Sequence, residues 1–315
     1  MIVVVIPAYK VKKHILSVID QIGSEVHKVF VVDDACPETS GKYVVENCKD
    51  PRVKVLFHDA NQGVGGAMVT GFRQCIQEGA SIVVKIDGDG QMNPKLIPKF
   101  IKPLQDGVAD YTKGNRFFFL ESLQSMPFLR IYGNATLSFI TKASTGYWKT
   151  MDPSNGFFAI HGKLLKYLPL EKLDRRFFFE SDMLFRLNIL RAVVLDIPMD
   201  SIYEDEKSNL SISKISVSFP LKHLIRFYKR IIYNYYLRDF NSASIQLMLG
   251  KLMILAGTLF GANKWMQGEQ RGIPATSGTV MIATLPIILG FQMILAAIQY
   301  DVSSVPDKPI HVNLD

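Results

Sequence analysis

Three oxygen-bearing side chains alternate along one short stretch of this 315-residue chain. Asp87, Asp89 and Gln91 follow a run of mainly β-branched residues, 81–86, that predicts a buried strand. Alternate residues of an extended chain point the same way, so these side chains can converge on one cation. Carboxylate and amide oxygens suit a hard ion that also carries substrate phosphates. The stretch therefore predicts a site for Mg²⁺ or Mn²⁺ formed by Asp87, Asp89 and Gln91.

Two other interpretations of the same residues are a calcium-binding loop and a polar turn without a ligand. A calcium loop of the EF-hand type needs Gly at its sixth position and Glu at its twelfth, where this chain has Met92 and Pro98. A single Asp-x-Asp pair is common in ordinary turns. The surrounding sequence must therefore decide between a turn and a metal site.

Apolar runs alternate with helical patterns through the first part of the chain. The predicted strands are residues 2–6, 28–32, 53–57, 81–86 and 109–113, and the predicted helices are about 12–22, 39–48 and 66–78. We expect Pro7 to end the first strand. The alternation predicts an α/β fold with a parallel, doubly wound sheet.

Polar clusters follow four of these predicted strands. They are Pro7-Ala8-Tyr9, Asp33-Asp34, Asn61-Gln62-Gly63 and Asp87-Gly88-Asp89. Ligands of such sheets bind beyond the carboxyl ends of the strands, so the four clusters are expected at one ligand-binding edge.

The glycine-rich stretch after Gly63 does not match the dinucleotide-binding motif, because Met68 stands in place of its third glycine. Two interpretations remain open here. The stretch can begin a helix whose first N–H groups face a nucleotide diphosphate, or it can be a closely packed loop.

Six short motifs occur together in the first two thirds of the chain. They are Val5-Ile6-Pro7-Ala8-Tyr9, Val31-Val32-Asp33-Asp34, Asn61-Gln62-Gly63, Asp87-Gly88-Asp89-Gly90-Gln91, Gly114-Asn115-Arg116 and Asp152-Pro153-Ser154-Asn155-Gly156-Phe157. Together they resemble family 2 glycosyltransferases with the GT-A nucleotide-sugar fold. Within that family they are similar to the dolichyl-phosphate mannose synthase and polyprenyl-phosphate glycosyltransferase branch. The resemblance covers roughly residues 1–215, and Ala35-Cys36 departs from the usual motif.

The resemblance implies metal-dependent, inverting transfer of a sugar from a nucleotide-sugar donor to a membrane polyprenyl phosphate. It implies that the donor is bound by Pro7, Ala8, Tyr9, Asp33, Asp34, Gly63 and Asp87. It implies that the acceptor phosphate is bound by Arg116, Arg130, Asn134 and Lys207. The implied catalytic residues are Asp89, Arg116 and Asp182.

The nature of the acceptor decides what Asp182 does. A phosphate monoester is largely dianionic at pH 7 and attacks without a strong base, whereas a sugar hydroxyl needs one. Asp182 would be that base if the acceptor were the hydroxyl of a lipid-linked saccharide, and the alternative role is to orient the sugar or the acceptor. A further alternative is a non-catalytic membrane adaptor with the same fold. A processive polysaccharide synthase would show a Q-x-x-R-W motif, and neither Trp148 nor Trp265 follows an arginine.

Two apolar stretches, 245–262 and 278–298, predict a transmembrane hairpin joined by about fifteen residues, 263–277. Two buried helices of a soluble domain are the alternative. The predicted organisation is a catalytic domain at 1–215, juxtamembrane amphipathic helices at 216–243, transmembrane helices at 244–300 and a tail at 301–315.

The net charge of +7 comes largely from basic residues that precede the first apolar stretch. They are Lys222, Arg226, Lys229, Arg230 and Arg238, whereas the connection between the stretches has only Lys264 and Arg271. This asymmetry predicts a cytoplasmic catalytic domain. Basic residues interleaved with aromatic ones here favour an anionic bilayer as partner over nucleic acid. Nothing in the sequence fixes the sugar, the nucleotide or the oligomeric state, a homo-oligomer included.

Overall fold

The structure, a computed structural model, describes residues 1–118, 128–200 and 212–314, with side chains described from residue 132 and from residue 218 onward in the last two ranges. The chain forms two compact units. The first contains residues 1–227 and 306–315, and the second contains residues 228–305.

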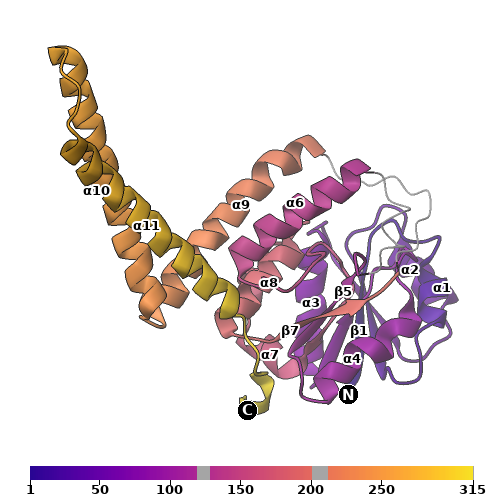
Figure 1. The fold of residues 1–315 in the computed structure, drawn as a ribbon. Coiled ribbons are helices and arrows are strands. Elements are labelled where there is room, and N and C mark those ends of the chain that lie inside the picture. Colours follow the sequence, from indigo (N-terminus) through magenta and orange to yellow (C-terminus); the bar gives the residue numbers. More distant parts are fainter. Residues whose placement is uncertain (119–127, 201–211, 315) are drawn as a thin grey trace. The chain divides into compact units, whose positions relative to one another are not determined.

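A seven-stranded sheet with the order β3-β2-β1-β4-β6-β5-β7 is the centre of the first unit (Figure 1). Its strands are β1 (Ile2–Ala8), β2 (Lys28–Asp33), β3 (Val53–Phe57), β4 (Ile82–Lys85), β5 (Tyr111–Asn115), β6 (Phe158–His161) and β7 (Val194–Pro198). The first four strands are parallel, as the sequence predicts. The sheet as a whole is mixed, because β6 runs antiparallel to both β4 and β5. The prediction of a parallel sheet is therefore wrong at β6, whereas β5 and β7 run in the same direction as β1 to β4.

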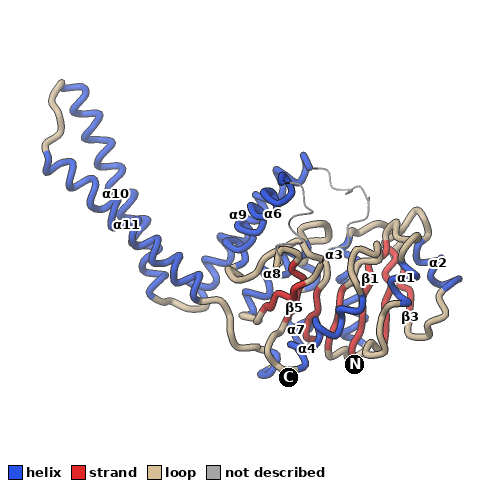
Figure 2. Tube along the Cα trace, turned by 45° about the vertical axis from the view of Figure 1, so that its right-hand side comes forward, coloured by secondary structure: helices blue, strands red, loops and turns tan. Residues whose placement is uncertain are grey.

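Helices lie on both sides of this sheet, as Figure 2 shows with the strands in red. The helices of this unit are α1 (Ile15–Asp20), α2 (Ser40–Asn47), α3 (Val64–Gln77), α4 (Ile97–Gln105), α6 (Phe128–Thr145), α7 (Gly162–Tyr167), α8 (Phe179–Leu190) and the greater part of α9 (Ile212–Ile232). Short 3₁₀ turns occur at Pro94–Leu96, Leu170–Lys172 and His311–Asn313. The three helices predicted in the first part of the chain are confirmed to within three residues at each end.

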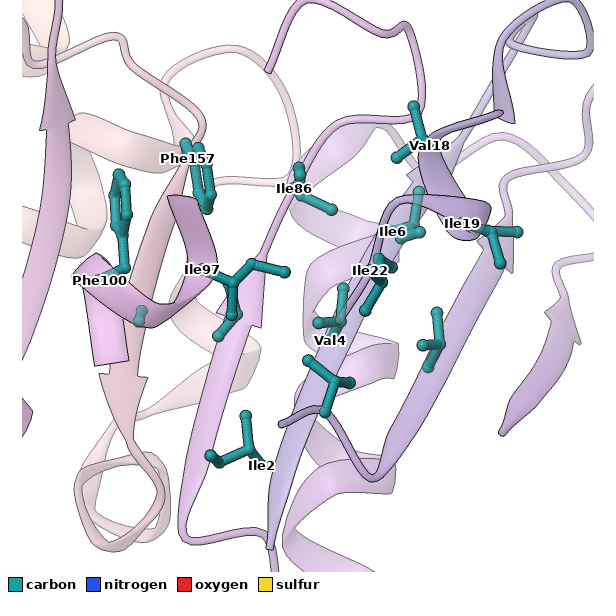
Figure 3. Packing of buried hydrophobic residues seen from close by; sticks show 14 of the residues in the cluster. Ile2, Val4, Ile6, Val18, Ile19, Ile22, Ile86, Ile97, Phe100 and Phe157 are labelled. Atoms are coloured by element: carbon teal, nitrogen blue, oxygen red, sulfur yellow. The ribbon is translucent and has the colours of Figure 1, made fainter. Parts of the chain in front are cut away.

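The side chains of β1 alternate between two apolar layers. Ile2, Val4 and Ile6 lie in a cluster with residues of α1 and α4 (Figure 3), in which the rings of Phe100 and Phe157 stack with centroids 3.9 Å apart. On the opposite face a Cβ on Gly71 of α3 would lie 2.4 Å from a methyl carbon of Val5, so helix and strand approach closely. Each fully buried aliphatic side chain contributes roughly 1.5–3 kcal/mol, which makes β1 a rigid support for the loops at its end.

Pro7 lies inside β1, which continues to Ala8, so the predicted strand end is wrong. The carbonyl of Val5 accepts from the N–H of Ile86, and that of Ala8 accepts from the N–H of Asp34. The backbone of Pro7 therefore faces the β4 side, where β4 already ends opposite Val5. A proline at this point removes no hydrogen bond from the sheet, which is where a strand tolerates it.

The second unit contains two long helices, α10 (Ser242–Arg271) and α11 (Ser277–Ser303), after a π-helical turn at Tyr233–Leu237. Both are long and apolar enough to cross a membrane, and only 11% of the most apolar window of each is buried. The alternative of two buried helices does not fit that exposure. The connection between the two helices is shorter than predicted, because α10 continues to Arg271. Gly272, with a φ of 67°, caps its end.

Close backbone packing joins α10 to α11. A Cβ on Gly250 would lie 2.8 Å from the carbonyl oxygen of Gly290, and a Cβ on Gly290 would lie 2.6 Å from that of Gly250. Small residues at such crossings allow the van der Waals contact that drives helix association in lipid.

A buried ion pair lies within the second unit at the end of α11. Arg230 is 1% exposed, and its two terminal nitrogens lie 2.6 Å and 2.9 Å from the carboxylate oxygens of Asp301. The hydroxyl of Tyr235 also donates to Asp301. Arg230 was predicted to face an anionic bilayer, and the structure instead gives it a partner inside the protein.

The C-terminal residues from Pro306 belong to the first unit. The N–H groups of Ile310 and His311 and the Nδ1 of His311 hydrogen-bond to the carboxylate of Asp110, which is fully buried. The N–H of Val193 donates to the same carboxylate. The chain therefore returns to the first unit after the two long helices.

Candidate active site

An ammonium group between two carboxylates marks the end of β4. The Nζ of Lys85 lies 2.9 Å from Oδ1 of Asp87 and 3.2 Å from Oε1 of Glu180, which is in the first turn of α8. Burial favours a lower pKa for Lys85, but the two carboxylates outweigh it and the pKa lies above its ordinary value. Burial raises the pKa of Glu180, although Lys85 opposes the rise. Lys85 therefore stays protonated and holds one oxygen of Asp87 in place.

Gly156 closes the space beside this ammonium group. A Cβ at Gly156 would lie 2.5 Å from both Oδ2 of Asp87 and Nζ of Lys85. Any larger residue would displace one of these atoms. The structure thus brings the 152–157 motif against the Asp87 loop, which the sequence alone does not show.

The two other predicted metal ligands lie in the same loop. Asp89 and Gln91 are half-buried, and the N–H of Gln91 donates to Oδ1 of Asp89 at 3.0 Å. Gly90 between them has a φ of 82°, and the ring of His14 lies beside it. Within residues 1–118, 128–200 and 212–314, no three His, Cys, Asp or Glu side chains form a ready metal cluster. Two carboxylates and an amide fit a hard cation that takes its other ligands from phosphates and water.

Asp34 organises the Asn61-Gln62-Gly63 loop. It is 3% exposed, and its carboxylate accepts the N–H groups of Gln62 and Gly63, each at 2.7 Å. The Nδ1 of His58 lies 2.8 Å from the same carboxylate, and its Nε2 lies 2.8 Å from the hydroxyl of Thr70. The sequence predicts Asp34 as a donor-binding residue, and the structure gives both of its oxygens partners within the protein.

Asp33 similarly organises the loop after β2. Its carboxylate accepts the N–H of Cys36 at 2.7 Å and the N–H of Gly41, in the first turn of α2, at 2.5 Å. Ala35, which lies between Asp33 and Cys36, has a backbone φ of 50°. The departure Ala35-Cys36 thus falls at a strained turn held by Asp33.

The remaining residues predicted to bind the donor near β1 differ in exposure. Pro7 is half-buried, Ala8 is fully buried and Tyr9 is 43% exposed.

The beginning of α3 is closed by another backbone segment. The N–H groups of Gly65 and Gly66 donate to the carbonyl of Arg175 at 3.0 Å and 3.3 Å. Gly63 has a φ of 83°, and a Cβ there would lie 2.4 Å from the same carbonyl oxygen. The stretch does begin a helix, since α3 starts at Val64, but the N–H groups of Gly65 and Gly66 are used within the protein, as close packing predicts.

Arg116 follows β5 and is held by Asp152. Its Nε and Nη2 each donate to one carboxylate oxygen at 2.7 Å, and its backbone N–H donates to the same group at 3.1 Å. Asp152 is 1% exposed and also accepts the side-chain N–H of Asn155. Burial opposes ionisation, but Arg116 outweighs it and holds the pKa of Asp152 below its ordinary value. The pair is therefore ionised, and it fixes the guanidinium plane of Arg116.

The other predicted acceptor residues lie partly outside the described side chains. Arg130 is in the first turn of α6, but its side chain is outside the described part of the structure. Asn134 is half-buried one turn further on, and Lys207 lies outside the described residues. The arrangement of these three residues around Arg116 stays a prediction.

Asp182 lies in α8, and its carboxylate contacts residues outside the Asp87 loop. It is fully buried, and Arg226 Nε lies 2.5 Å from one of its oxygens. The other oxygen accepts Nε of Arg186 at 3.1 Å and the N–H of Asp174 at 3.0 Å. The carboxylate of α8 that joins Asp87 through Lys85 is Glu180, which sequence reasoning did not single out.

Comparisons with known proteins found a matching family model and several similar sequences. A sequence model described as "Glycosyl transferase family 2" matches residues 3–168. The UDP-N-acetylglucosamine–dolichyl-phosphate N-acetylglucosaminyltransferase of Methanococcus voltae is 29% identical over 219 residues, which are 65% of this chain and 87% of the relative. The polyprenol monophosphomannose synthase of Mycolicibacterium smegmatis is 26% identical over 221 residues, 68% of this chain and 81% of that protein.

The fold is also similar to solved structures. Glucosyl-3-phosphoglycerate synthase from Mycobacterium tuberculosis, in complex with Mn²⁺, uridine diphosphate and phosphoglyceric acid, matches with a TM-score of 0.51. The match has 16% sequence identity and covers 73% of this chain and 78% of the synthase. At that identity the likeness shows a common fold and nothing about the substrate.

Proposed function

This chain belongs to glycosyl transferase family 2, and we propose that it transfers a sugar from a nucleotide sugar to a membrane polyprenyl phosphate. It is a glycosyltransferase with the GT-A fold that its motifs predicted. The names of the relatives from Methanococcus voltae and Mycolicibacterium smegmatis support a polyprenyl or dolichyl phosphate acceptor. One observation carries the proposal: the Asp87 loop at the sheet edge and two exposed apolar helices long enough to span a membrane occur in the same chain.

The donor is proposed to lie against the ends of β1, β2 and β4. Tyr9 is exposed there, and Asp34 fixes the backbone of Asn61–Gly63 next to the buried ends of these strands. Asp87, 28% exposed in its side chain, is held toward the same edge by Lys85. Mg²⁺ or Mn²⁺, bound by Asp87, Asp89 and Gln91, would neutralise the charge that develops on the leaving nucleoside diphosphate.

The acceptor phosphate is proposed to bind at Arg116, with Arg130, Asn134 and Lys207 as further contacts. Arg116 is 22% exposed in its side chain and is fixed in its plane by Asp152. A fixed guanidinium binds phosphate through directed hydrogen bonds, which a flexible ammonium group does not reproduce. A phosphate monoester is already a good nucleophile at neutral pH, so the chain need not supply a base. Direct attack on the anomeric carbon inverts its configuration.

We further propose that α10 and α11 span the membrane, with residues 1–215 as the catalytic domain and 216–243 at the membrane surface. The described residues up to Phe227 and those from Pro306 belong to one compact unit, which supports a hairpin whose two ends lie on one side of the membrane. The basic residues before α10 support the cytoplasm as that side.

A donor screen tests this function. Full-length protein in detergent would receive a short-chain polyprenyl phosphate, Mg²⁺ or Mn²⁺ and each member of a panel of nucleotide sugars. We expect one donor to give a glycosylated lipid and the Asp89→Asn variant to give none while remaining folded. Turnover by Asp89→Asn close to wild type, or full activity in excess EDTA, would contradict the metal-dependent mechanism.

A further inference from the structure

Helix α9, which precedes the two long helices in the chain, contacts a short segment in front of α8. Lys222 on α9 forms an ion pair with Asp174. Arg226, one turn later, binds Asp182, which also accepts the N–H of Asp174. The guanidinium of Arg226 lies 5.5 Å from the ring centroid of Phe185, which further fixes its position. Two basic residues of α9 thus fix the position of Asp174.

Asp174 in turn shapes the two residues that follow it. Its carboxylate accepts the N–H of Arg176 at 3.0 Å, and Arg176 then accepts the N–H of Phe179 at the start of α8. We call residues Asp174–Arg176 the brace segment. Its geometry therefore depends on Asp174, and Asp174 is held from α9.

The brace segment forms four hydrogen bonds to residues Asn61–Gly63 and the first turn of α3, which together we call the Asn61–Gly66 loop. The carbonyl of Arg175 accepts the N–H groups of Gly65 and Gly66. The guanidinium groups of Arg175 and Arg176 donate to the side-chain oxygens of Gln62 and Asn61 at 3.3 Å and 3.2 Å. The other side of this loop is held by Asp34. Removing the brace segment would remove these four hydrogen bonds and leave those to Asp34.

We infer that the brace segment transmits the position of α9 to the Asn61–Gly66 loop, and that Lys222 and Arg226 are positioning residues for donor binding. This inference rests on the proposed function, because it takes the Asn61–Gly66 loop as part of the donor site. It follows that the affinity for the donor depends on the position of α9, the helix that precedes the two proposed membrane-spanning helices in the chain.

The experiment uses full-length protein in detergent with two readouts. One is the Kd of uridine diphosphate and of guanosine diphosphate with Mn²⁺, measured by calorimetry. The other is hydrogen exchange at the amides of Gly65 and Gly66 without ligand. The variants are Lys222→Met and Arg226→Met, with Lys222→Arg as the conservative rescue. Lys229→Met is the matched control, because Lys229 is an exposed lysine two turns further along α9.

For Lys222→Met we expect faster exchange at both glycine amides and a Kd about two- to fivefold higher, the range that a partly exposed ion pair provides. Lys222→Arg should restore both values and Lys229→Met should match wild type. Unchanged exchange and unchanged Kd in Lys222→Met would overturn the inference. Arg226→Met leaves buried Asp182 with one partner fewer, so Lys222→Met decides the matter if Arg226→Met fails to fold.

The two readouts separate this inference from the proposed function. If wild-type protein binds neither diphosphate, the donor assignment is wrong, and the exchange rates still report whether α9 controls the loop. If wild type binds a diphosphate and the exchange at Gly65 and Gly66 is the same in every variant, the donor assignment stands and the brace is wrong.

Discussion

Arg116 and Asp152 face each other as two forks, with Nε and Nη2 each 2.7 Å from one carboxylate oxygen. Asp152 lies at the start of the 152–157 motif and has a φ of 53°, a backbone conformation that costs free energy in a non-glycine residue. The surrounding contacts maintain this conformation. The arrangement gives the motif a physical role, which is to fix the guanidinium that we propose for the acceptor phosphate.

Replacing Arg116 by lysine should weaken acceptor binding more than donor binding. The ammonium group keeps the charge but cannot form both bonds to Asp152, so the cation loses its fixed direction. We expect the KM for polyprenyl phosphate to rise about tenfold or more and the KM for the nucleotide sugar to change little. Asp152→Asn should have the same selective effect with an added loss of stability of about 3–5 kcal/mol. Equal changes in both KM values would argue against this role for Arg116.

Asp182→Asn should reduce stability and leave catalysis nearly intact. The substitution removes a buried negative charge between Arg186 and Arg226, which typically costs about 3–5 kcal/mol. We expect a clearly lower unfolding temperature. We expect kcat to stay within about fivefold of wild type, which corresponds to a change of about 1 kcal/mol in the activation free energy. The comparison variant is Arg130→Ala, which should raise the KM for polyprenyl phosphate. A stable but inactive Asp182→Asn beside an unimpaired Arg130→Ala would instead indicate a saccharide hydroxyl as acceptor.

Lys85→Met should damage both folding and activity. It would leave Glu180 and Asp87 without their shared counter-charge in a site where Lys85 is 1% exposed, at a cost of about 3–5 kcal/mol. The remaining folded protein should lose turnover, because Asp87 is no longer held. Thermal unfolding and kcat of the full-length protein measure the two effects. Lys102→Met is the control, since Lys102 is 73% exposed, and a Lys85→Met variant as stable as that control would refute the buried ion-pair description.

Stability should fall with acid because His223 is buried as a neutral imidazole. Its Nδ1 lies 2.8 Å from the Ser144 hydroxyl, which itself donates to the carbonyl of Thr141. Burial first, and then nearby Arg226, lowers the pKa of His223 to about 4. Between about pH 6.5 and pH 4 the unfolded chain therefore binds a proton that the folded chain does not. The free energy of unfolding has its full value above about pH 6.5, and it declines by up to about 3 kcal/mol as the pH falls to about 4.

Unfolding midpoints of the full-length protein at pH 7.5 and pH 5 measure this effect. His161, whose pKa is also lowered to about 4 by burial and by His311, contributes a similar dependence. The His223→Asn variant keeps a donor toward Ser144 and should show a smaller loss between the two pH values. An unchanged pH dependence in that variant would show that His223 is not the titrating group.

The sequence predicted the parts of the fold whose signals are local. The β-branched runs located β1 to β4, and the two apolar stretches located α10 and α11. It failed at Pro7, because whether a proline breaks a strand depends on the neighbour that its missing N–H would face. That neighbour is β4, and its end opposite Val5 is a matter of sheet register, which no local pattern shows.

The sequence indicated which strand ends carry polar side chains, and it did not indicate what those side chains contact. Lys85 and Glu180 are 95 positions apart, and no local pattern marks them as partners. The polar clusters correctly indicated the sheet edge. Asp34, however, uses its oxygens to hold a loop, and only the three-dimensional structure distinguishes that role from contact with a ligand. The docking of His311 on Asp110, 201 positions away, was likewise invisible to any motif.

The most direct test of the account is the chemical identity of the acceptor atom. Full-length protein, a metal ion and the active nucleotide sugar would be given either a polyprenyl phosphate, the matching polyprenyl alcohol, or a polyprenyl-linked saccharide. Mass spectrometry of the lipid products then locates the new sugar. The account predicts one added sugar on the phosphate of the polyprenyl phosphate and no product from the other two lipids. A sugar found on the saccharide, with polyprenyl phosphate unchanged, would contradict it.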